Sequence, residues 1–437
     1  MSEWKKVKIG DICKIVKGTT GIASAEPGQY PLVVTAEERK NCATYQFDCE
    51  AVCIPLVSSS GHGKKSLKNV HYQSGKFALG TILCAVIPNN PQELDARYLH
   101  QYLQFYKDII LVPLMKGAAN VSLSMKDIAT VEFPLPPIDR QRELSNLFVS
   151  LQGKQKELSA EYEKQTEYAK LLCQNILQQA IEGKLTADWR KQNPVQKGNP
   201  NYDAEALFEQ IQKERNSEKK QKELSPITDE EKPFEIPEGW KWGRLGDLLE
   251  SITYGTSQKC FYDSTQNTPI LRIPNVSQGN ISAEDLKYTN LSESEKQELS
   301  LRENDILVIR SNGSPEIVGK MINVSKDFEN YCYAGYLVRL RFIFPVLGFF
   351  IAKISQASVL RKQIEEPLRT TVGINNINAE ELKMLKFPLC PLAEQKEIVA
   401  RVEKYLQTVA VLEAQITERE QLTKTLFQSI LNEAFEE

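Results

Sequence analysis

Histidine is scarce in this chain, since only His62, His71 and His100 occur among 437 residues. A histidine-based catalytic triad or metal site therefore has few possible members. The sequence also lacks an uninterrupted apolar run of the roughly 20 residues that cross a bilayer. Its first residues, MSEWKKVKIGD, lack the apolar core of a secretory signal. We expect a cytoplasmic protein without a membrane segment.

No CxxC motif occurs, and the nine cysteines are scattered along the chain. An odd number of scattered cysteines favours reduced thiols over a disulfide framework. Cys42, Cys49, Cys53 and Cys84 share the first third of the chain with His62 and His71, but their spacings match no zinc motif. Single cysteines in strands are usually small buried hydrophobic residues. We therefore predict no metal site.

The common catalytic motifs are missing as well. The sequence has no GxxxxGK[ST] phosphate loop and no GxGxxG after a predicted strand, and GHGKK at Gly61 has too few glycines. The Asn/Asp/Ser-Pro-Pro-aromatic tetrapeptide of adenine methyltransferases is absent, because Leu135-Pro136-Pro137-Ile138 has the wrong flanks. These absences speak against an enzyme, and no catalytic residue is predicted.

Composition indicates a globular protein, with 41% hydrophobic and 25% charged residues and a length sufficient for two or three domains. The net charge of -3 hides an uneven distribution. Residues 1–138 hold 15 Lys and Arg against 12 Asp and Glu, and residues 240–391 hold 18 against 17. These two segments permit an anionic ligand without requiring one.

The chain repeats itself at a long offset. WKKVKIGDI from Trp4 matches WKWGRLGDL from Trp240, 236 residues later, and FPLPPIDRQRE from Phe133 matches FPLCPLAEQKE from Phe387, 254 residues later. The second offset holds without a gap over 50 positions with 15 identities, where composition alone gives roughly 3. Two copies of one architectural unit follow, and the second is longer in its interior by 18 residues.

Each copy ends in a long predicted helix. Mostly apolar residues alternate four and three apart, as a and d positions of a coiled coil do. They are Leu144, Phe148, Leu151, Gln155, Leu158, Tyr162, Gln165, Ala169, Leu172 and Ile176, and, at the 254-residue offset, Ile398, Val402, Tyr405, Val409, Leu412, Ile416, Arg419, Thr423, Leu426 and Ile430. A helix of more than forty residues, roughly 60 to 70 Å long, cannot bury this stripe on one small domain. We expect the two helices to pack together, with Gln165 and Arg419 either fixing their register or lying at a solvated break.

Short alternating runs between Gly, Asn, Ser and Pro predict strands before each long helix. They are Tyr30 to Thr35, Ala51 to Val57, Thr81 to Ile87, Ile270 to Ile273, Asp305 to Arg310 and Gly335 to Phe344, and helices are predicted after them over 95–110 and 348–365. The polar residues between the copies predict a surface linker with one helix over 204–223. The predicted fold is α+β, with mixed α/β domains at 1–138 and 239–391, long helices at 139–183 and 392–437, and the linker at 184–238.

This arrangement resembles the specificity subunit of a Type I restriction-modification system over essentially the whole chain. The resemblance is carried by FPLPPIDRQRE and FPLCPLAEQKE, by ILQQAIEGKLTADWR and by PFEIPEGWKWGRLGDL. ITYGTSQKC, PILRIPNV, NDILVIRSNGSPEIVGK and AGYLVRLR are similar to stretches of that family's target recognition domains.

The resemblance implies a DNA-binding subunit that performs no catalysis. Each target recognition domain would recognise one half of a bipartite site in double-stranded DNA, and the two helices would lie antiparallel as a coiled-coil spacer. Two DNA adenine methyltransferase (modification) subunits and two restriction subunits would assemble on this chain. S-adenosylmethionine and ATP would bind to those partners, so this chain would hold no cofactor. Because the second copy is longer, we expect the two half-sites to differ.

Loops that combine base-reading side chains with glycine-rich, basic turns are the candidates for DNA contact. In the second copy they are Tyr254, Gly255, Thr256, Ser257, Lys259, Arg272, Asn275, Arg310, Ser311, Asn312 and Lys320. In the first copy they are Lys17, Gly18, Thr19 and Thr20, together with Ser58, Ser59, Ser60, Gly61, His62, Gly63, Lys64 and Lys65. The alternative for any one of them is a solvated turn residue that touches nothing.

Two other functional classes stay open on the sequence. One is a standalone nuclease or methyltransferase acting on DNA, which would be active without partners. The other is a scaffold for proteins alone, which salt-dependent binding to duplex DNA would exclude.

Overall fold

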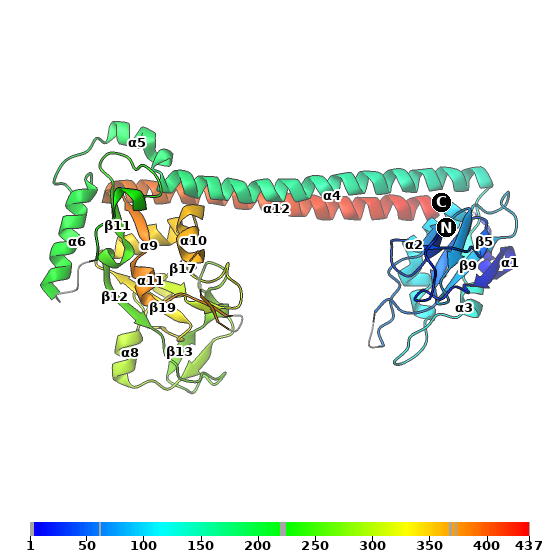
Figure 1. Ribbon diagram of the computed structural model, residues 1–437, viewed down its shortest axis with the longest axis horizontal. Coiled ribbons are helices and arrows are strands. Elements are labelled where there is room, and N and C mark those ends of the chain that lie inside the picture. The colour runs from blue at the N-terminus through cyan, green and yellow to red at the C-terminus, as the bar shows by residue number, and fades with distance from the viewer. Residues whose placement is uncertain (1–3, 61–62, 219–223, 367–368, 372–373, 437) are drawn as a thin grey trace. The chain divides into compact units, whose positions relative to one another are not determined.

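The computed structural model describes residues 4–60, 63–218, 224–366, 369–371 and 374–436. The chain forms two compact units, Met1–Lys164 with Ile416–Glu437, and Gln165–Gln415. Each unit contains one α/β domain and a part of both long helices (Figure 1). In the part of the chain that the structure describes, no helix is both long and apolar enough to cross a membrane.

The first domain is built on two four-stranded sheets. One has the order β2-β9-β6-β7 with antiparallel neighbours, and the other has the order β4-β3-β8-β5 with β3 and β8 parallel. Strand β6 is buried at every residue, which is why its sequence, AVCIP, does not alternate with polar residues. The elements are α1 (Ile9–Ile12), β2 (Cys13–Lys17), β3 (Tyr30–Val33), β4 (Lys40–Cys42), β5 (Phe47–Asp48), β6 (Ala51–Pro55), β7 (His71–Gln73), β8 (Lys76–Leu79), β9 (Leu83–Pro88), α2 (Ala96–Ile110) and α3 (Met125–Ala129).

Among the described residues, the second domain repeats these strand orders except that its second sheet has no strand at the place of β5. Its sheets have the orders β12-β19-β15-β17 and β14-β13-β18, and β13 and β18 are again parallel. The elements are β12 (Leu249–Tyr254), β13 (Thr268–Leu271), α7 (Ile273–Val276), β14 (Lys287–Thr289), α8 (Glu293–Leu299), β15 (Ile306–Ile309), β16 (Ser311–Asn312), β17 (Met321–Asn323), β18 (Cys332–Tyr333), β19 (Leu337–Phe342), α9 (Pro345–Ile354), α10 (Ser358–Glu365), β20 (Arg369–Thr371), β21 (Ile374–Asn376) and α11 (Ala379–Lys383).

The strand registers locate the extra residues of the second copy. The pair Leu32 and Ala78 corresponds to Ile270 and Cys332, which gives an offset of 238 at β13. In the neighbouring strands, β4 and β14, Lys40 lies opposite Leu32 and Lys287 lies opposite Ile270. The offset between these two strands is therefore 247 residues. At β15 the offset is 254, because Val308 faces Val338 as Ile54 faces Cys84. The predicted longer interior is therefore confirmed, and most of it lies in the connections that carry α7 and α8.

The two sequence motifs that revealed the repeat are hydrogen-bonded to each other in both copies. Strand β1 (Lys6–Lys8) pairs with β10 (Glu132–Pro134), with Val7 opposite Phe133. Strand β11 (Lys241–Arg244) pairs with β22 (Lys386–Leu389), with Gly243 opposite Phe387. The start of each domain is thus joined to the strand that leads into its long helix, which fixes where that helix begins.

The long helices are α4 (Ile138–Ile181) and α12 (Leu392–Glu436), and they pack antiparallel as predicted (Figure 1). In the first unit, the rings of Phe148 and Phe435 lie 6.4 Å apart, and Tyr162 Oη lies 2.9 Å from Thr423 Oγ1. Residue numbers increase along α4 as they decrease along the facing part of α12, so the two helices run in opposite directions. The Arg419 guanidinium lies 5.7 Å from the Tyr162 ring centroid, so this polar seam position packs on an aromatic ring.

The structure differs from the sequence prediction in two helical regions. The helix predicted over 348–365 is two helices, α9 and α10, because Ala357 is extended with ψ of 139°. The linker helix α6 (Ala204–Glu218) ends before 219–223, which lie outside the described residues. The linker, predicted to lie at the surface, contributes to the core instead, since Ala204, Leu207 and Ile211 are fully buried. A short helix, α5 (Ala187–Gln192), was not predicted.

One buried histidine, His71, and one half-buried histidine, His100, predict how the stability of the first domain depends on pH. His71 is 5% exposed, and burial, with a smaller effect of Arg39, lowers its pKa to about 4. Burial also lowers the pKa of His100. An unfolded histidine titrates near pH 6.5, so this stability is complete above about pH 6.5 and is lost as the pH falls toward 4, by roughly 2 to 3 kcal/mol for His71.

We expect the thermal unfolding midpoint of the full chain to fall over this pH window, and to fall less in a His71→Gln variant. The comparison isolates His71 from the other groups that titrate in the same range. An equal fall in both proteins would show that His71 is not the group responsible.

Candidate nucleic-acid interface

The first candidate turn has the same structure in both domains. Gly18 N donates to the Leu83 carbonyl, and Gly255 N donates to the carbonyl of the equivalent Leu337. A Cβ atom would lie 2.2 Å from a backbone oxygen at Gly18 and 2.3 Å from one at Gly255. Only glycine allows this close approach of two backbones. The two turns therefore share the same backbone contacts.

Around these glycines, most of the predicted side chains are exposed. Lys17 and Thr19 are exposed in the first domain, and Tyr254, Ser257 and Lys259 are exposed in the second. Thr20 is half-buried, and Thr256 is 9% exposed, with its hydroxyl accepting from Gln258 N. Gln46 was not predicted from the sequence, and it holds the first turn by accepting from Thr19 N and donating to the Lys17 carbonyl, both at 3.0 Å.

The serine-rich loop of the first domain is closed by its own hydroxyl groups. Ser58 Oγ donates to the Lys64 carbonyl at 2.5 Å, Ser59 Oγ accepts from Lys68 N at 2.9 Å, and Ser60 Oγ lies 2.7 Å from Ser66 Oγ. These hydroxyls thus organise the loop, and they leave Lys64 and Lys65 exposed at its surface. Gly61 and His62 lie outside the described residues.

Arg310 lies between β15 and β16, at the start of the corresponding loop in the second domain. Its guanidinium carbon lies 4.8 Å from the Tyr254 ring centroid, and Nη1 donates to the Gly335 carbonyl at 3.4 Å. The buried Nε finds no hydrogen-bond partner among the described residues. The Tyr254 hydroxyl accepts from Ala379 N at 2.9 Å, which fixes the ring that carries the guanidinium. The structure thus brings together two residues predicted from separate loops.

A hairpin that the sequence did not reveal extends each of these loops. In the second domain, β16 pairs with β21, which places Ser311 opposite Asn376 and Asn312 opposite Asn375, and β21 pairs with β20. Asn375 is 6% exposed and donates to the Gly313 carbonyl at 3.1 Å. Its hairpin therefore supports the loop that carries Asn312.

The first domain has the same hairpin in reduced form. Isolated bridges join Ser122 to both Val57 and Lys116, and Ser122 is equivalent to Asn376 at the 254-residue offset. A Cβ atom on Gly63 would lie 2.2 Å from the Ala118 carbonyl oxygen, so the lysine loop and the hairpin are in contact. The 254-residue offset that aligns the two copies from Phe133 onward also aligns these two hairpins. Their sequences share too few identities for the sequence alone to reveal this.

A second group of predicted residues lies around α7 and is bound more tightly into the fold. Arg272 pairs with Asp285 at 3.0 Å, and Asn275 is 2% exposed with its amide donating to the Ser282 and Glu284 carbonyls. Hydrogen bonds from Tyr262 and Arg272 hold the pKa of Asp285 below its usual range, so this ion pair persists at neutral pH. Asn275 therefore organises the loop rather than facing solvent. Lys320 Nζ donates to the Ser277 carbonyl at 3.3 Å.

Exposed aromatic rings accompany these cations. Tyr262 is 68% exposed, with Lys287 Nζ at 4.5 Å and the Arg272 guanidinium at 5.8 Å from its ring centroid. Tyr336 is 62% exposed, and its carbonyl accepts from Arg310 N. Basic groups interleaved with exposed rings suit stacking and phosphate contact with nucleic acid. Tyr262 and Tyr336 were not predicted from the sequence, although each lies in a loop that also carries glycine, lysine or arginine.

The cysteines of the first domain that share its core are packed as small apolar residues. Cys42, Cys53 and Cys84 are buried in its core, and burial raises the pKa of the Cys84 thiol to about 12. Within the described ranges, no three His, Cys, Asp or Glu side chains are arranged to hold a metal ion.

A family model described as Type I restriction modification DNA specificity domain matches residues 1–168 and 237–421, one segment for each copy of the repeat. The chain belongs to this family. The chain is similar to the EcoKI specificity subunit of Escherichia coli strain K12, with 26% identity over 323 residues, 74% of this chain and 61% of that protein. The EcoDI specificity subunit of Escherichia coli is 24% identical over 438 residues, 99% of this chain and 88% of that protein.

The fold agrees with this Type I specificity family. The crystal structure of the HsdS subunit from Thermoanaerobacter tengcongensis superposes with a TM-score of 0.55 at 17% identity, over 99% of this chain and 96% of that chain. The predicted fold class is confirmed by this match and by the two paired helices. The match to EcoKI spans less than two thirds of that relative's length.

Proposed function

We propose that this chain is the DNA specificity subunit of a Type I restriction-modification complex and that each α/β domain recognises one half of a bipartite site in double-stranded DNA. The observation that supports this most is the repetition of one loop cluster in both domains, with the same constrained glycine at Gly18 and Gly255. The chain itself performs no catalysis. S-adenosylmethionine and ATP bind to the partner subunits.

The paired helices would serve as the spacer between the half-sites. At 1.5 Å per residue, the 44 residues of α4 give a rod of about 66 Å. Because the helices are antiparallel, one long helix begins at each domain and the other long helix ends there. The two domains can then meet the two strands of DNA in related ways, as in other proteins that bind spaced half-sites.

Apolar residues that are exposed at equivalent positions of both helices support the binding of two modification subunits. Leu158, Tyr168 and Leu172 on α4 are 38%, 65% and 44% exposed, and the residues 254 positions later, Leu412, Leu422 and Leu426 on α12, are 44%, 59% and 58% exposed. Exposed apolar groups of this size mark interaction surfaces. Because the positions repeat, the same partner can bind once to each helix. Two restriction subunits complete the complex that the family resemblance implies.

Substitutions on these helices should remove the modification subunits one at a time. We expect Tyr168→Glu and Leu422→Glu each to leave one subunit bound, and the double variant to leave none, because a buried carboxylate without a partner costs several kcal/mol. Native mass spectrometry of the complex measures the stoichiometry. Lys164→Glu, a change at an exposed polar position of α4, is the control and should keep two. Unchanged stoichiometry in the double variant would contradict this surface.

DNA binding tests the proposed function itself. The chain assembled with its modification subunits should bind duplex DNA with an affinity that falls steeply with salt and should prefer one sequence from a randomised pool. Binding without any sequence preference, or binding that salt does not weaken, would overturn the proposal.

A further inference from the structure

The sequence motif that leads into each long helix contains a glutamine that is buried in both copies. Gln141 is fully buried and Gln395 is 1% exposed, and they occupy equivalent positions of FPLPPIDRQRE and FPLCPLAEQKE. Each side-chain amide donates to a carbonyl just before the helix, that of Pro136 at 2.8 Å and that of Cys390 at 2.7 Å. This shared bond holds the turn that precedes the helix.

Gln141 makes two further hydrogen bonds that reach into the first domain. Its Nε2 also donates to the Glu93 carbonyl and its Oε1 accepts from Asp95 N, both at 2.8 Å. Asp95 is the N-cap residue of α2. Gln395 makes no equivalent link, because its buried Oε1 finds no partner among the described residues. The Gln141 side chain therefore joins the first turn of α4 to the N-terminus of α2.

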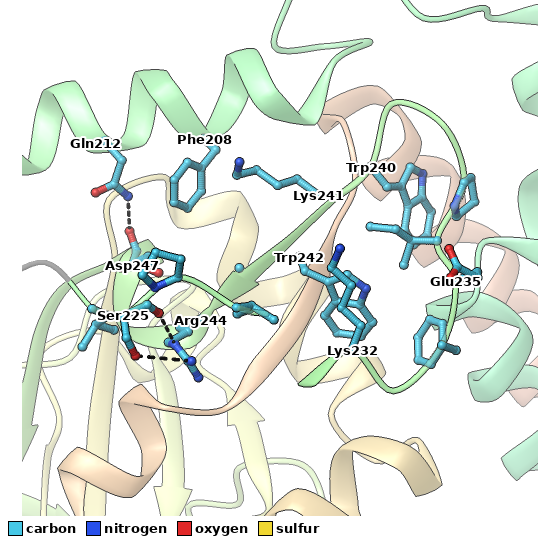
Figure 2. Close-up of a pocket in the computed structure, with 17 residues that line it drawn as sticks. Phe208, Gln212, Ser225, Lys232, Glu235, Trp240, Lys241, Trp242, Arg244 and Asp247 are labelled. Atoms are coloured by element: carbon cyan, nitrogen blue, oxygen red, sulfur yellow. Dashed lines mark hydrogen bonds between the residues drawn. The ribbon is translucent and has the colours of Figure 1, made fainter. Parts of the chain in front are cut away.

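In the second copy the neighbouring residue, Glu394, makes the link instead. Its side chain is 1% exposed and lies in the first turn of α12. Oε1 accepts from Thr186 Oγ1 at 2.6 Å and from Arg190 Nη1 at 2.5 Å, and Oε2 accepts from Trp240 Nε1 at 2.7 Å. Thr186 follows α4, Arg190 belongs to α5, and Trp240 precedes β11 and lines the cavity between this strand, α6 and the linker (Figure 2). Glu394 therefore joins the start of α12 to the end of α4 and to the start of the second domain.

Further along each helix, buried apolar residues contact the domain. Leu144 and Phe148 on α4, and Ile398 and Val402 on α12, lie in the two cores. Apolar burial is not directional, so such contacts persist when a domain tilts slightly on its helix. A buried hydrogen bond does not persist, because a tilt leaves its donor or its acceptor unpaired. Gln141 and Glu394 thus supply a directional part of each junction.

We propose that Gln141 and Glu394 are positioning residues that hold each domain at one angle to the long helix that follows it, and that they keep the gap between the half-sites constant. This inference rests on the proposed function, in which the helix pair separates the half-sites. The length of the helices sets the mean gap. A movement of about 3.4 Å at the DNA, the rise of one base pair, would allow a neighbouring gap. The two buried side chains oppose that movement.

Methylation of duplexes in which the gap varies by single base pairs tests this role. The assay uses the full chain assembled with its modification subunits, and the half-sites and the original gap are those of the unsubstituted complex. We expect Gln141→Leu and Glu394→Gln each to raise methylation at gaps one base pair shorter or longer about tenfold relative to the original gap, because buried groups lose their partners. In Glu394→Gln the amide nitrogen faces a donor at whichever oxygen it replaces.

Gln395→Leu is the matched control. It makes the same substitution at the equivalent buried position, but the bond that it removes lies within the turn before the helix. We expect it to keep the single gap, even where its thermal unfolding midpoint falls as far as that of Gln141→Leu. Thr186→Val removes one donor to Glu394 with little change of shape, and it should broaden the gap in the same direction if Glu394→Gln does not fold.

A single, unchanged gap in Gln141→Leu and in Thr186→Val would overturn the proposal. The same broadening in Gln395→Leu as in Gln141→Leu would also overturn it, since loss of stability alone would then explain the effect. These outcomes leave both half-sites recognised and the proposed function intact. An unsubstituted complex that methylates without sequence preference would instead contradict the proposed function itself.

Discussion

Deleting one heptad from each long helix should shorten the gap between the two half-sites by about three base pairs. Seven residues at 1.5 Å per residue are about 10.5 Å, and B-form DNA rises about 3.4 Å per base pair. Residues 159–165 and 420–426 are the pair to remove, because Tyr162 and Thr423 face each other across the seam. Deleting a whole heptad from both helices keeps the a and d positions in register.

The methylated motif of the shortened protein measures this effect, with both half-sites unchanged and only the gap reduced. Deleting the heptad from α4 alone is the control. This single deletion shifts the a and d positions of α4 relative to their partners on α12. It should therefore abolish methylation rather than shorten the gap between the half-sites. A shortened protein that methylates sites with the original gap would contradict the spacer role of the helices.

Replacing Arg310 should relax recognition at one base pair of the second half-site. Its guanidinium is held by the Tyr254 ring and by the Gly335 carbonyl, and no ion pair to a carboxylate is found for it in the described part of the chain. A guanidinium group held in this way can donate two hydrogen bonds to the major-groove edge of one guanine. We expect Arg310→Ala to cost about 1 to 3 kcal/mol of discrimination at that position, which is roughly a 5- to 150-fold loss.

The first half-site of the same complex serves as an internal control for Arg310→Ala and should keep its sequence. Arg310→Lys keeps the charge without the planar fork, and we expect it to lose discrimination as well. Lys64→Ala with Lys65→Ala should instead weaken all sequences alike, because exposed lysines contact phosphates. An equal loss across sequences for Arg310→Ala would demote Arg310 to a phosphate contact.

The repeat and the helices could be predicted from the sequence because their signals are local and periodic. At the predicted a and d positions of α4 and α12, residues such as Phe148 and Val402 are buried as expected. The prediction was wrong at Leu158, Leu172, Leu412 and Leu426, which are 38% to 58% exposed, so the seam is not closed along its whole length. The break between α9 and α10 could not be predicted in this way. It depends on the extended backbone of Ala357, a residue with high helix propensity, so tertiary packing overrides propensity there.

The candidate interface was predictable only in part. The glycine turns were visible, because two backbones that approach closely require glycine at Gly18 and Gly255. The pairing of β16 with the hairpin of β20 and β21 was not, since its partners Asn312 and Asn375 lie more than sixty residues apart in sequence. The buried position of Asn275 was equally hidden, because its partners Ser282 and Glu284 belong to an irregular loop with no periodic pattern.

The most direct test of the central claim is a map of methylated adenines in the genome of a cell that expresses this chain with its modification subunits. Under the proposed spacer role of the paired helices, two domains with different loops predict a single motif with two different half-sites separated by a fixed number of unread base pairs. A continuous motif, or half-sites at variable separation, would contradict the account.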